Sequence, residues 1–507
     1  MYFVPKLILM QKYILAIDQG TTSSRAILFN ASGEIISTAQ KEFTQYFPQP
    51  GWVEHDALEI WDTQLLVCQQ VLQQANINAN NIAAIGITNQ RETTVAWNKN
   101  TGLPICKAIV WQDKRTANYC NSIKKQHSNM VQTKTGLVID AYFSGTKIKW
   151  ILENIPEAKI LAAENNLAFG TIDSWLLYKL TNHKIHATDV SNASRTMLCN
   201  IHTLQWDTEL CNLLQVPKNL LPTILESSQV YGYTNLLGGS IPIASLIGDQ
   251  QAALFGQMCV QPGMIKNTYG TGCFMLMNTG TKAVPSTNNL LTTVAWKING
   301  VTNYALEGSV FIAGAVVQWL RDSLQIIKTS AEVETLSNSV KNTDGVYVVP
   351  AFVGLGAPYW SQEARGNICG LTRGSTLAHI ARASVESIAY QVADVLLAMQ
   401  YDAKINFTDI RVDGGATANN MLMQFQSNIT QTRVTKPTIT ETTALGAAYL
   451  AGLAVGFFKN IETLKTQWKI EKIFNPEITE AAKNKLYKGW QAAVKGTLTI
   501  AQENIKL

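Results

Sequence analysis

The sequence lacks the features that mark secreted, membrane-spanning and nucleic-acid-binding proteins. None of its eight cysteines stands in a CxxC pair, which favours reduced thiols over a disulfide framework. No block of five like charges occurs and the net charge is only +5, so we expect no nucleic-acid partner. The longest uncharged apolar run, from Ala444 to Phe458, is too short to cross a bilayer and predicts a buried helix packed closely on a sheet. We therefore expect a cytoplasmic protein with no membrane insertion.

Three nucleotide-binding folds are excluded because their motifs are missing. No GxxxxGK[ST] run occurs, which excludes a P-loop protein. No HRD and DFG set occurs, which excludes a protein kinase. No GxGxxG follows the first predicted strand, which argues against a dinucleotide-binding fold.

The chain is long, and its composition is that of a globular protein. Its 507 residues suit two domains, and apolar residues make up 46% of them. Residues 1–10 are interrupted by Pro5 and Lys6 and offer no small-residue cleavage site, so they make a poor signal peptide. Met10 is an alternative start.

A strand–turn–strand pattern rich in hydroxyl groups follows this segment. The apolar residues 14–17 predict a buried strand that ends at Asp18, and residues 26–29 predict the next strand. Between them lie Gly20 and the hydroxyl residues 21–24. A tight glycine turn presents backbone N–H groups to an anion, and a carboxylate beside it is suited to a divalent cation. The pattern indicates a polyphosphate and Mg²⁺ site, although an ordinary polar hairpin explains it equally well.

The pattern continues as a mixed α/β arrangement. Residues 34–40 predict a third strand and residues 82–87 a short buried one. Between them Asp56 is expected to be a helix N-cap, with Glu59 as its capping-box partner. Three strands, a helix and a strand predict a sheet with parallel and antiparallel neighbours. The expected apolar face of the helix consists of Leu58, Trp61, Leu65, Cys68 and Leu72.

Polar residues follow the strand at 82–87. Ligands of open α/β sheets gather at the carboxyl ends of strands, so Arg91 and Glu92 offer a donor and an acceptor to a polyhydroxy ligand. A structural ion pair is the simpler interpretation of these two residues. Trp111 and Tyr142 could form apolar walls with polar tips, although core packing is the default for each.

Asp249 ends another apolar strand, directly before an alanine-rich helix. The positive end of a helix keeps a carboxylate ionised, so Asp249 could accept a proton from a substrate hydroxyl and help to hold a metal ion. A helix N-cap aspartate is the simpler interpretation and is favoured by this stretch alone.

Two further turns suit a phosphorylated ligand. Residues 266–274 form a second strand–turn–strand with a Gly-Thr-Gly turn, which hints at two similar domains that each present a phosphate-binding hairpin. Residues 411–420 place a Gly-Gly turn between a strand and a helix, where the backbone can approach a flat or phosphorylated ligand.

In combination these stretches resemble the FGGY family of carbohydrate kinases. The resemblance runs from about Lys12 to about Trp490, nearly the whole chain. Six stretches in family order carry it: DQGTTS at 18–23, NQRET at 89–93, YFSGTKIKW at 142–150, GDQQ at 248–251, NTYGTGCF at 267–274, and GLTRG at 370–374 together with ESIAYQ at 386–391.

The resemblance implies an α/β fold of two ribonuclease H-like domains of the actin and sugar-kinase type, with a catalytic cleft between them. Residues 1–254 would hold the polyol and one phosphate-binding hairpin, and residues 255–507 would bind the adenosine of ATP. Among the family's reactions the motifs favour transfer of phosphate from Mg²⁺-ATP to glycerol, which gives sn-glycerol 3-phosphate. The family also implies a homo-oligomer, either a dimer or a tetramer.

The resemblance also implies roles for individual residues. Asp249 would be the catalytic base, and Asp18 and Asp249 would serve the metal site. These implied roles override the interpretation of Asp249 as an N-cap, and the glycerol-binding roles below override the interpretation of Arg91 and Glu92 as a structural ion pair. The implied glycerol-binding residues are Arg91, Glu92, Trp111, Tyr142, Asp249, Gln250 and Phe274. The implied ATP-binding residues are Thr21, Thr22, Ser23, Arg25, Thr271, Gly314, Gln318, Gly415 and Asn419.

The chain departs from the family pattern in three places. Ala141 replaces the proline expected before Tyr142. The loop 235–240 is shorter than in some bacterial members and lacks the arginine that takes part in their inhibition by fructose bisphosphate. The histidine that is phosphorylated in some Gram-positive members is not evident at 231–235. The last two departures argue against those forms of regulation.

Two other functions remain open at this point. One is a family kinase for another polyol or sugar, which the small-substrate set of Arg91, Glu92, Trp111 and Phe274 argues against. The other is a non-enzymatic, actin-like ATP-binding protein, which would need neither the NQRET nor the GDQQ stretch.

Overall fold

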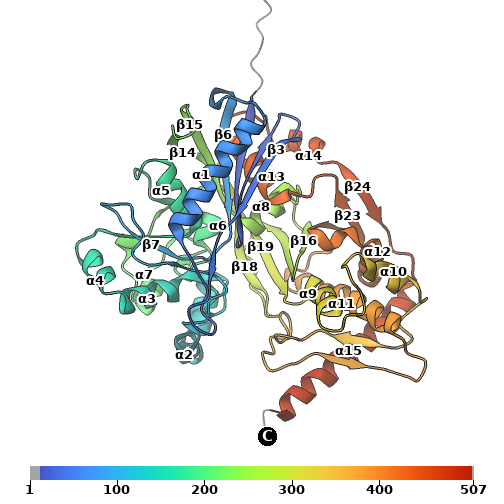
Figure 1. Ribbon diagram of the computed structural model, residues 1–507. Coiled ribbons are helices and arrows are strands. Elements are labelled where there is room, and N and C mark those ends of the chain that lie inside the picture. Colours follow the sequence, from blue (N-terminus) through green and yellow to red (C-terminus); the bar gives the residue numbers. More distant parts are fainter. Residues whose placement is uncertain (1–11, 505–507) are drawn as a thin grey trace, which may run out of the picture. The chain divides into compact units, whose positions relative to one another are not determined.

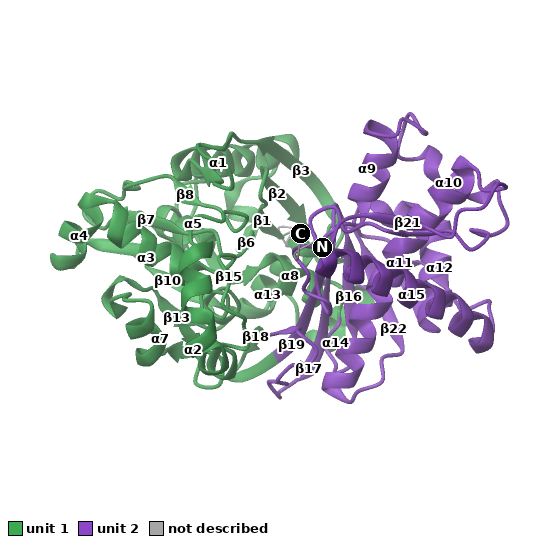
Figure 2. Ribbon diagram, turned by 90° about the horizontal axis from the view of Figure 1, so that it is seen from below, with its two compact units in different colours: residues 1–258, 293–303, 441–467 green, residues 259–292, 304–440, 468–507 purple. Residues whose placement is uncertain are grey.

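The computed structural model describes residues 12–504, so Met10 and the preceding segment lie outside the described residues. The chain divides into two compact units, coloured separately in Figure 2. Unit 1 comprises the chain up to Met258 together with Thr293–Asn303 and Glu441–Gln467, and unit 2 comprises Cys259–Thr292, Tyr304–Thr440 and the chain from Trp468 onward.

The central sheet of unit 1 is mixed, as predicted. Strands β1, β2 and β3 form an antiparallel meander, whereas β6 pairs in parallel with β1 and with β15. The predicted meander and the mixed sheet are therefore confirmed (Figure 1). In sheet order the strands are β14 (Ser228–Thr234), β15 (Ile241–Gly248), β6 (Ile82–Asn89), β1 (Tyr13–Gln19), β2 (Ser23–Phe29) and β3 (Ile35–Glu42).

The sheet of unit 2 repeats this core. An antiparallel hairpin, β16 and β17, is followed by parallel β22 and β23, as β1 and β2 are followed by β6 and β15. The repeated order confirms two similar domains of ribonuclease H-like topology. In sheet order the strands are β18 (Leu291–Ile298), β19 (Val301–Val310), β17 (Cys273–Gly280), β16 (Ile265–Tyr269), β22 (Asp409–Asp413), β23 (Arg433–Pro437) and β24 (Ile470–Phe474).

Helix α1 (Ala57–Gln74) begins as predicted but is rotated relative to the prediction. The Asp56 carboxylate caps it by accepting from the N–H groups of Leu58 and Glu59. The capping-box prediction is wrong, because the Glu59 carboxylate accepts from the backbone N–H and hydroxyl of Thr44. The predicted apolar face is correct only in part, since Leu58 is exposed and Trp61 and Leu65 are half-buried. The residues that α1 buries are Ala57, Ile60, Thr63, Gln64, Val67, Cys68, Val71 and Leu72.

Helix α13 (Thr442–Ala454) belongs to unit 1 although it comes late in the chain. The division into functional domains between residues 254 and 255 stays a prediction. Helix α13 is apolar on nearly all sides, and it packs on α8 (Asp249–Gly256) and β6 in unit 1. The predicted buried helix is confirmed, but its point of closest approach is Gly446, where an added Cβ would lie 1.9 Å from the carbonyl oxygen of Ala252.

This contact predicts a large effect of one methyl group. Gly446→Ala should lower the melting temperature, because the backbone of α8 must move away at a cost of about 1–3 kcal/mol. Gly496→Ala is the matched control, since a Cβ there meets nothing within 4 Å inside α15 (Glu480–Asn504). That change should leave stability unchanged or raise it by up to about 1 kcal/mol. Equal melting temperatures for the two variants would contradict the tight contact.

The remaining elements complete the two units around separate apolar cores. The other helices are α2 (Ala117–Thr135), α3 (Ser144–Asn154), α4 (Pro156–Ala163), α5 (Ile172–Leu180), α6 (Val190–Ala193), α7 (Thr208–Leu213), α9 (Gly314–Asp322), α10 (Glu332–Asn338), α11 (Leu377–Ala403), α12 (Asn420–Thr430) and α14 (Ile461–Gln467). The short strands are β4 (Gln45–Tyr46), β5 (Glu54–His55), β7 (Val95–Asn98), β8 (Ala108–Ile109), β9 (Leu167–Gly170), β10 (Ala187–Asp189), β11 (Cys199–Asn200), β12 (Gln205–Trp206), β13 (Thr223–Leu225), β20 (Tyr347–Val349) and β21 (Asn367–Cys369).

Candidate functional site

The carboxyl ends of three parallel strands bring the polar residues of unit 1 together. In the register, Asp18 of β1 pairs with Thr88 of β6, and Gly248 of β15 pairs with Asn89 of β6. Asp18, the Arg91–Glu92 turn and Asp249 therefore lie at one edge of the sheet. The sequence predicted this convergence from the strand ends alone, and ligands of open α/β sheets bind at such an edge.

Arg91 is the centre of this cluster. Its side chain is 2% exposed, and its Nε lies 3.3 Å from Oδ1 of Asp249 and 3.8 Å from Oε1 of Glu92. It also donates to Oε1 of Gln251 at 3.3 Å and to the Tyr142 hydroxyl at 3.4 Å. The ion pair with Glu92 is present, as the simpler interpretation expected. The guanidinium nevertheless also contacts two other segments of the chain, the start of α8 and the turn before α3.

Aromatic residues lie against this polar cluster. The rings of Trp111 and Tyr142 meet edge to face with centroids 5.6 Å apart. The indole N–H of Trp111 donates to the Thr21 hydroxyl at 3.0 Å, which links this wall to the first hairpin. Both aromatic residues are half-buried, so each keeps a surface that a small ligand can contact.

Asp249 is the first residue of α8, and the N-cap position belongs to Gly248. Its Oδ1 accepts from the N–H of Gln250 at 2.7 Å. With 31% of its side chain exposed, Asp249 is accessible, whereas Arg91 beside it is buried. The interpretation of Asp249 as the N-cap is therefore wrong. It is an accessible carboxylate at the positive end of a helix, held by one arginine.

The first hairpin is closed by a bond from the Gly20 N–H to the carbonyl of Ser23. Its turn residues are Thr21 and Thr22, and Ser23 opens β2, where its hydroxyl accepts from Gln40. Arg25 lies opposite Asp18 in the strand register and forms an ion pair with Glu441. The turn thus keeps its backbone and hydroxyl groups close to a carboxylate and an arginine.

Asp18 is suited to a divalent cation. Burial raises the pKa of its carboxyl to about 7, Arg25 opposes that rise, and the negative charges of Glu441 and Asp249 add to it. A cation between Asp18 and Asp249 would relieve the repulsion between these carboxylates. Mg²⁺ is commonly held by one or two carboxylates together with water and phosphate oxygens, so these two residues fit it. No group of three or more His, Cys, Asp or Glu side chains suited to a metal occurs in residues 12–504.

In unit 2 the predicted ATP residues gather around the second hairpin. The Gly314 N–H, at the start of α9, donates to the Gly270 carbonyl, and the neighbouring Ala315 N–H donates to the Thr271 carbonyl. A Cβ at Gly314 would lie 2.6 Å from the Gly270 oxygen, so a larger residue there would displace the helix from the turn. Gln318 lies one turn further along α9 and is exposed.

The Gly-Gly turn lies beside the same hairpin. Gly414 has a φ of +91°, and a Cβ there would lie 2.4 Å from the Tyr269 carbonyl oxygen. Gly415 follows in an exposed turn, and Asn419 caps α12. Phe274, the one predicted glycerol-binding residue in unit 2, lies half-buried on β17 opposite Thr268. The cleft between the domains stays a prediction.

Sequence reasoning assigned no role to three buried side chains of this region. The Nε of Arg195 donates to Oε1 of Glu92 at 2.6 Å, and Nζ of Lys147 donates to the Tyr142 carbonyl at 2.6 Å. Burial lowers the pKa of Lys147 to about 8. Gln251, the third residue, accepts from Arg91. Lys147 and Gln251 stand inside two of the family stretches, whereas no pattern in the sequence marks Arg195.

A buried polar network at α6 ties two of the strand ends together. Asp189 caps α6 and accepts from the amide of Asn192, which exchanges hydrogen bonds with the side chain of Asn89. The Ser191 hydroxyl of the same helix accepts from the Gly248 N–H at 2.9 Å. The residues that precede Arg91 and Asp249 are therefore held by one short helix.

Asp173 adds a second buried acid next to this network. It accepts from the hydroxyls of Thr171 and Thr188. Burial, followed by the charge of Asp189, raises the pKa of Asp173 from 3.8 to about 7. The folded state therefore holds this proton more tightly than the unfolded chain does. The stability that Asp173 contributes is present below about pH 4 and is lost as the pH rises through about 7.

Asp173→Asn should remove this dependence, because an amide resembles the protonated acid. Melting temperatures of both proteins at pH 5 and pH 8 measure the effect. The melting temperature of the variant should rise relative to that of the native protein between pH 5 and pH 8. An equal difference in melting temperature at both pH values would contradict the assignment.

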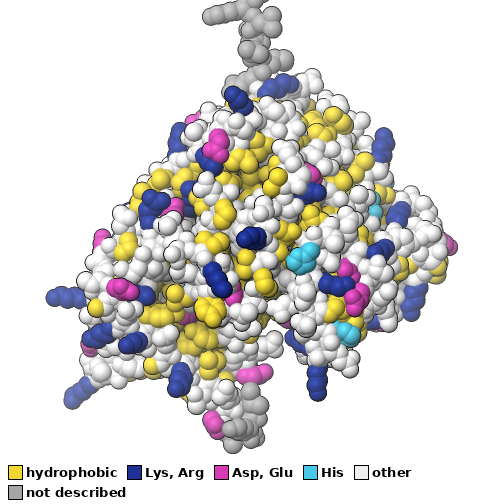
Figure 3. Space-filling model, turned by 180° about the vertical axis from the view of Figure 1, so that it is seen from behind, with side chains coloured by type: hydrophobic (Ala, Val, Ile, Leu, Met, Phe, Trp, Pro, Cys, Tyr) yellow, Lys and Arg dark blue, Asp and Glu magenta, His cyan; other side chains and the backbone are white. Residues whose placement is uncertain are grey.

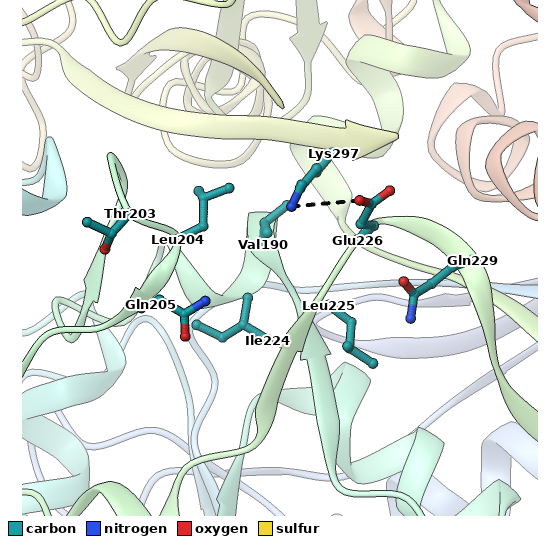
Figure 4. A pocket seen from close by; sticks show the side chains of 9 residues that line it. All are labelled: Val190, Thr203, Leu204, Gln205, Ile224, Leu225, Glu226, Gln229 and Lys297. Carbon is teal, nitrogen blue, oxygen red and sulfur yellow. Dashed lines mark ion pairs between the residues drawn. The ribbon is translucent and has the colours of Figure 1, made fainter. Parts of the chain in front are cut away.

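A separate hollow of about 200 Å³ in unit 1 contains none of the predicted site residues. Figure 4 shows it between apolar side chains of α6 and β13 and the ion pair of Lys297 with Glu226.

On the face shown in Figure 3, lysine and arginine side chains are scattered singly among neutral and acidic ones. Within residues 12–504, no helix combines the length and apolar composition needed to cross a bilayer.

Two family models match the chain. The model described as the FGGY family of carbohydrate kinases, N-terminal domain, matches residues 13–256, and its C-terminal domain matches residues 265–455. The two matches follow one another along the chain and together cover most of it.

Curated relatives and solved structures agree with these matches. A glycerol kinase from Chromobacterium violaceum is 59% identical over 97% of this chain and 99% of its own, and one from Deinococcus radiodurans is 59% identical over 95% and 97%. The crystal structure of Plasmodium falciparum glycerol kinase with ADP has a TM-score of 0.92 at 36% identity and covers 96% of this chain and 98% of its own. A gluconate kinase from Lactobacillus acidophilus, at 22% identity, has a TM-score of 0.87 over 97% and 98% of the two chains, and shows the fold alone.

Proposed function

Because this chain belongs to the FGGY family of carbohydrate kinases, we propose that it transfers the γ-phosphate of ATP to glycerol and forms sn-glycerol 3-phosphate. Relatives 59% identical over nearly the whole length bear the name glycerol kinase. The single structural observation that supports the proposal best is the buried Arg91, which faces both Glu92 and the accessible Asp249 at one sheet edge.

Polyol binding follows from the chemistry of this cluster. A guanidinium fork donates to hydroxyl oxygens, and a carboxylate accepts from hydroxyl protons, so Arg91 and Glu92 can hold two neighbouring hydroxyl groups. The ring edges of Trp111 and Tyr142 would cover the carbon chain, with Phe274 and Gln250 as further contacts by family resemblance. A short polyol bound in this way presents its last hydroxyl toward the exposed carboxylate.

Asp249 is the proposed base for that hydroxyl. It lies in the first turn of α8, contacts Arg91 and has 31% of its side chain exposed, so a substrate hydroxyl can reach it. Phosphoryl transfer depends mainly on alignment of the reacting groups and on neutralisation of phosphate charge. Mg²⁺ would offset phosphate charge, and Asp18 and Asp249 would hold it.

The two hairpins are the proposed phosphate-binding elements. Thr21, Thr22, Ser23 and Arg25 would contact the phosphates from the first hairpin, and Thr271 would contact them from the second. A Cβ at Gly415 would meet nothing within 4 Å, so its backbone is open to a nucleotide, whereas Gly314 lets α9 pack closely against the second hairpin. Gln318 and Asn419 are the remaining proposed nucleotide contacts.

Release of ADP with and without glycerol tests the proposal. Purified protein with Mg²⁺-ATP should release ADP rapidly only when glycerol is present, with glycerol 3-phosphate as the product. ADP release that is independent of any polyol would favour the actin-like alternative. Activity with xylulose or gluconate but not with glycerol would favour a kinase for another sugar.

Location and assembly also belong to the proposal. All eight cysteines are free in the structure, which suits the reducing cytoplasm. A homo-oligomer, either a dimer or a tetramer, stays a prediction that light scattering would test.

A further inference from the structure

The buried carboxylate of Glu92 has two arginine neighbours at different distances. Nε of Arg195 lies 2.6 Å from Oε1 of Glu92, whereas Nε of Arg91 lies 3.8 Å from the same oxygen. Both Arg195 and Glu92 are withdrawn from solvent, with side chains 0% and 1% exposed. A short, buried, charge-assisted hydrogen bond is a strong one. Arg195 is therefore the closer charge partner of Glu92.

Arg91 is shared among several groups, so it is not a dedicated partner of Glu92. Its guanidinium also lies near Asp249, Gln251 and the Tyr142 hydroxyl. One guanidinium that serves two carboxylates neutralises each of them incompletely, and an uncompensated buried carboxylate is costly. With Arg195 bound to Glu92, Arg91 can face Asp249 and a ligand hydroxyl.

Arg195 is held rigidly in this position. Its guanidinium carbon lies 5.2 Å from the ring centroid of Phe143 and 5.7 Å from that of Tyr142. Its backbone N–H donates to the Asn192 carbonyl at the end of α6, the helix that also ties down the ends of β6 and β15. Helix α6 therefore fixes the position of Arg195 as well as the strand ends that carry the site.

The backbone at Glu92 needs such support. Glu92 has a φ of +61°, a left-handed conformation that is uncommon for a residue with a side chain. Its carbonyl oxygen accepts from the hydroxyls of Ser144 at 2.8 Å and Thr94 at 3.1 Å. The carboxylate end is fixed by Arg195. The backbone and side chain of this residue are therefore held by its own turn and by two distant segments.

We propose that Arg195 is a positioning residue for polyol binding, which holds the Glu92 carboxylate ionised and oriented. The inference rests on the proposed function, because it takes Glu92 to be a glycerol-binding residue. The other charged groups near Glu92 are Arg91 and Lys147, and Lys147 donates to the Tyr142 carbonyl. Lys147 bonds the Tyr142 carbonyl, whereas Arg195 bonds the Glu92 carboxylate itself.

Arg195→Met tests the proposal, because methionine keeps much of the side-chain length but not the charge. The glycerol KM should rise about 30-fold or more, with the ATP KM unchanged. The acid limb of the pH profile of kcat/KM for glycerol should move to higher pH, because a buried carboxylate without its cation takes up a proton more readily. Arg195→Lys should recover part of both effects, since it restores the charge without the planar fork.

A double-mutant cycle separates positioning from a general structural role. In a Glu92→Gln background no carboxylate remains to be held, so adding Arg195→Met should change the glycerol KM little. This double variant also remains testable if Arg195→Met alone fails to fold, because it leaves no buried carboxylate unpaired. An effect of Arg195→Met that is undiminished in the Glu92→Gln background would overturn the proposal.

Arg115→Met is the matched control. Arg115 is also buried, with ion pairs to Asp113 and Glu54, and it stacks on Trp52 and Trp150. The Arg115→Met substitution should lower stability without changing the glycerol KM or the pH profile of kcat/KM for glycerol. An active native protein with an unaffected Arg195→Met variant would refute this inference alone. A native protein without glycerol-dependent ADP release would refute the proposed function instead.

Discussion

Asp249→Asn is expected to lower kcat at least about 100-fold while glycerol still binds. Asparagine keeps the size and most hydrogen bonding of the side chain but cannot accept a proton from the hydroxyl. The contact of Asp249 with Arg91 at 3.3 Å is also weakened, because it loses its charge. The loss of kcat would be larger if Mg²⁺ placement is disturbed as well, since the metal offsets much of the phosphate charge.

Single-turnover kinetics at saturating Mg²⁺-ATP, together with glycerol binding by calorimetry, measure this effect. The structure removes one alternative in advance. The cap position of α8 is occupied by Gly248, so loss of helix capping cannot account for a fall in rate. A folded Asp249→Asn protein that binds glycerol and keeps most of its kcat would show that another group accepts the proton.

Arg91→Ala is expected to weaken glycerol binding by about 2–4 kcal/mol, or roughly 30- to 1,000-fold, with little effect on ATP. The guanidinium is 2% exposed and bridges Glu92, Asp249 and Tyr142, so its removal leaves polar groups of the polyol site without their shared donor. Arg91 contacts Glu92, Asp249 and Tyr142, which are residues of the proposed polyol site, so ATP affinity should be largely spared.

Equilibrium binding of glycerol and of ATP, measured separately, tests this expectation. Arg91→Met serves beside the alanine variant, because it fills more of the buried volume and so separates loss of charge from loss of packing. Equal losses of affinity for both ligands would argue that Arg91 supports the unit as a whole. A loss confined to glycerol would support its assignment to the polyol site.

Local features of the chain were predictable because they depend on neighbours in sequence. The ends of β1 and β15 are set by apolar runs that stop at Asp18 and Gly248, and both hairpins follow from glycine and hydroxyl turns. The cap at Asp56 is local in the same way. These local signals are sufficient to predict that the candidate residues lie at strand ends and in turns.

The phase of a helix was not predictable from its period. The spacing in α1 is helical as expected, yet the buried side chains include Ile60, Gln64 and Val67 rather than Leu58. Several registers of apolar residues satisfy the same period, and packing against the sheet selects one of them. The contact of α13 with α8 has the same cause, since Gly446 meets Ala252 across 194 positions of the chain.

By itself the sequence determined the class of fold, the two hairpins, and the residue types that a phosphate, a metal ion and a polyol require. Tertiary structure alone decided which side chains that are distant in sequence meet. Arg195 lies 103 residues from Glu92 and Trp111 lies 90 residues from Thr21, and no local pattern specifies either contact. The reason is physical: a buried charge is tolerated only where the fold supplies its partner, and that partner is chosen by the packing of distant segments.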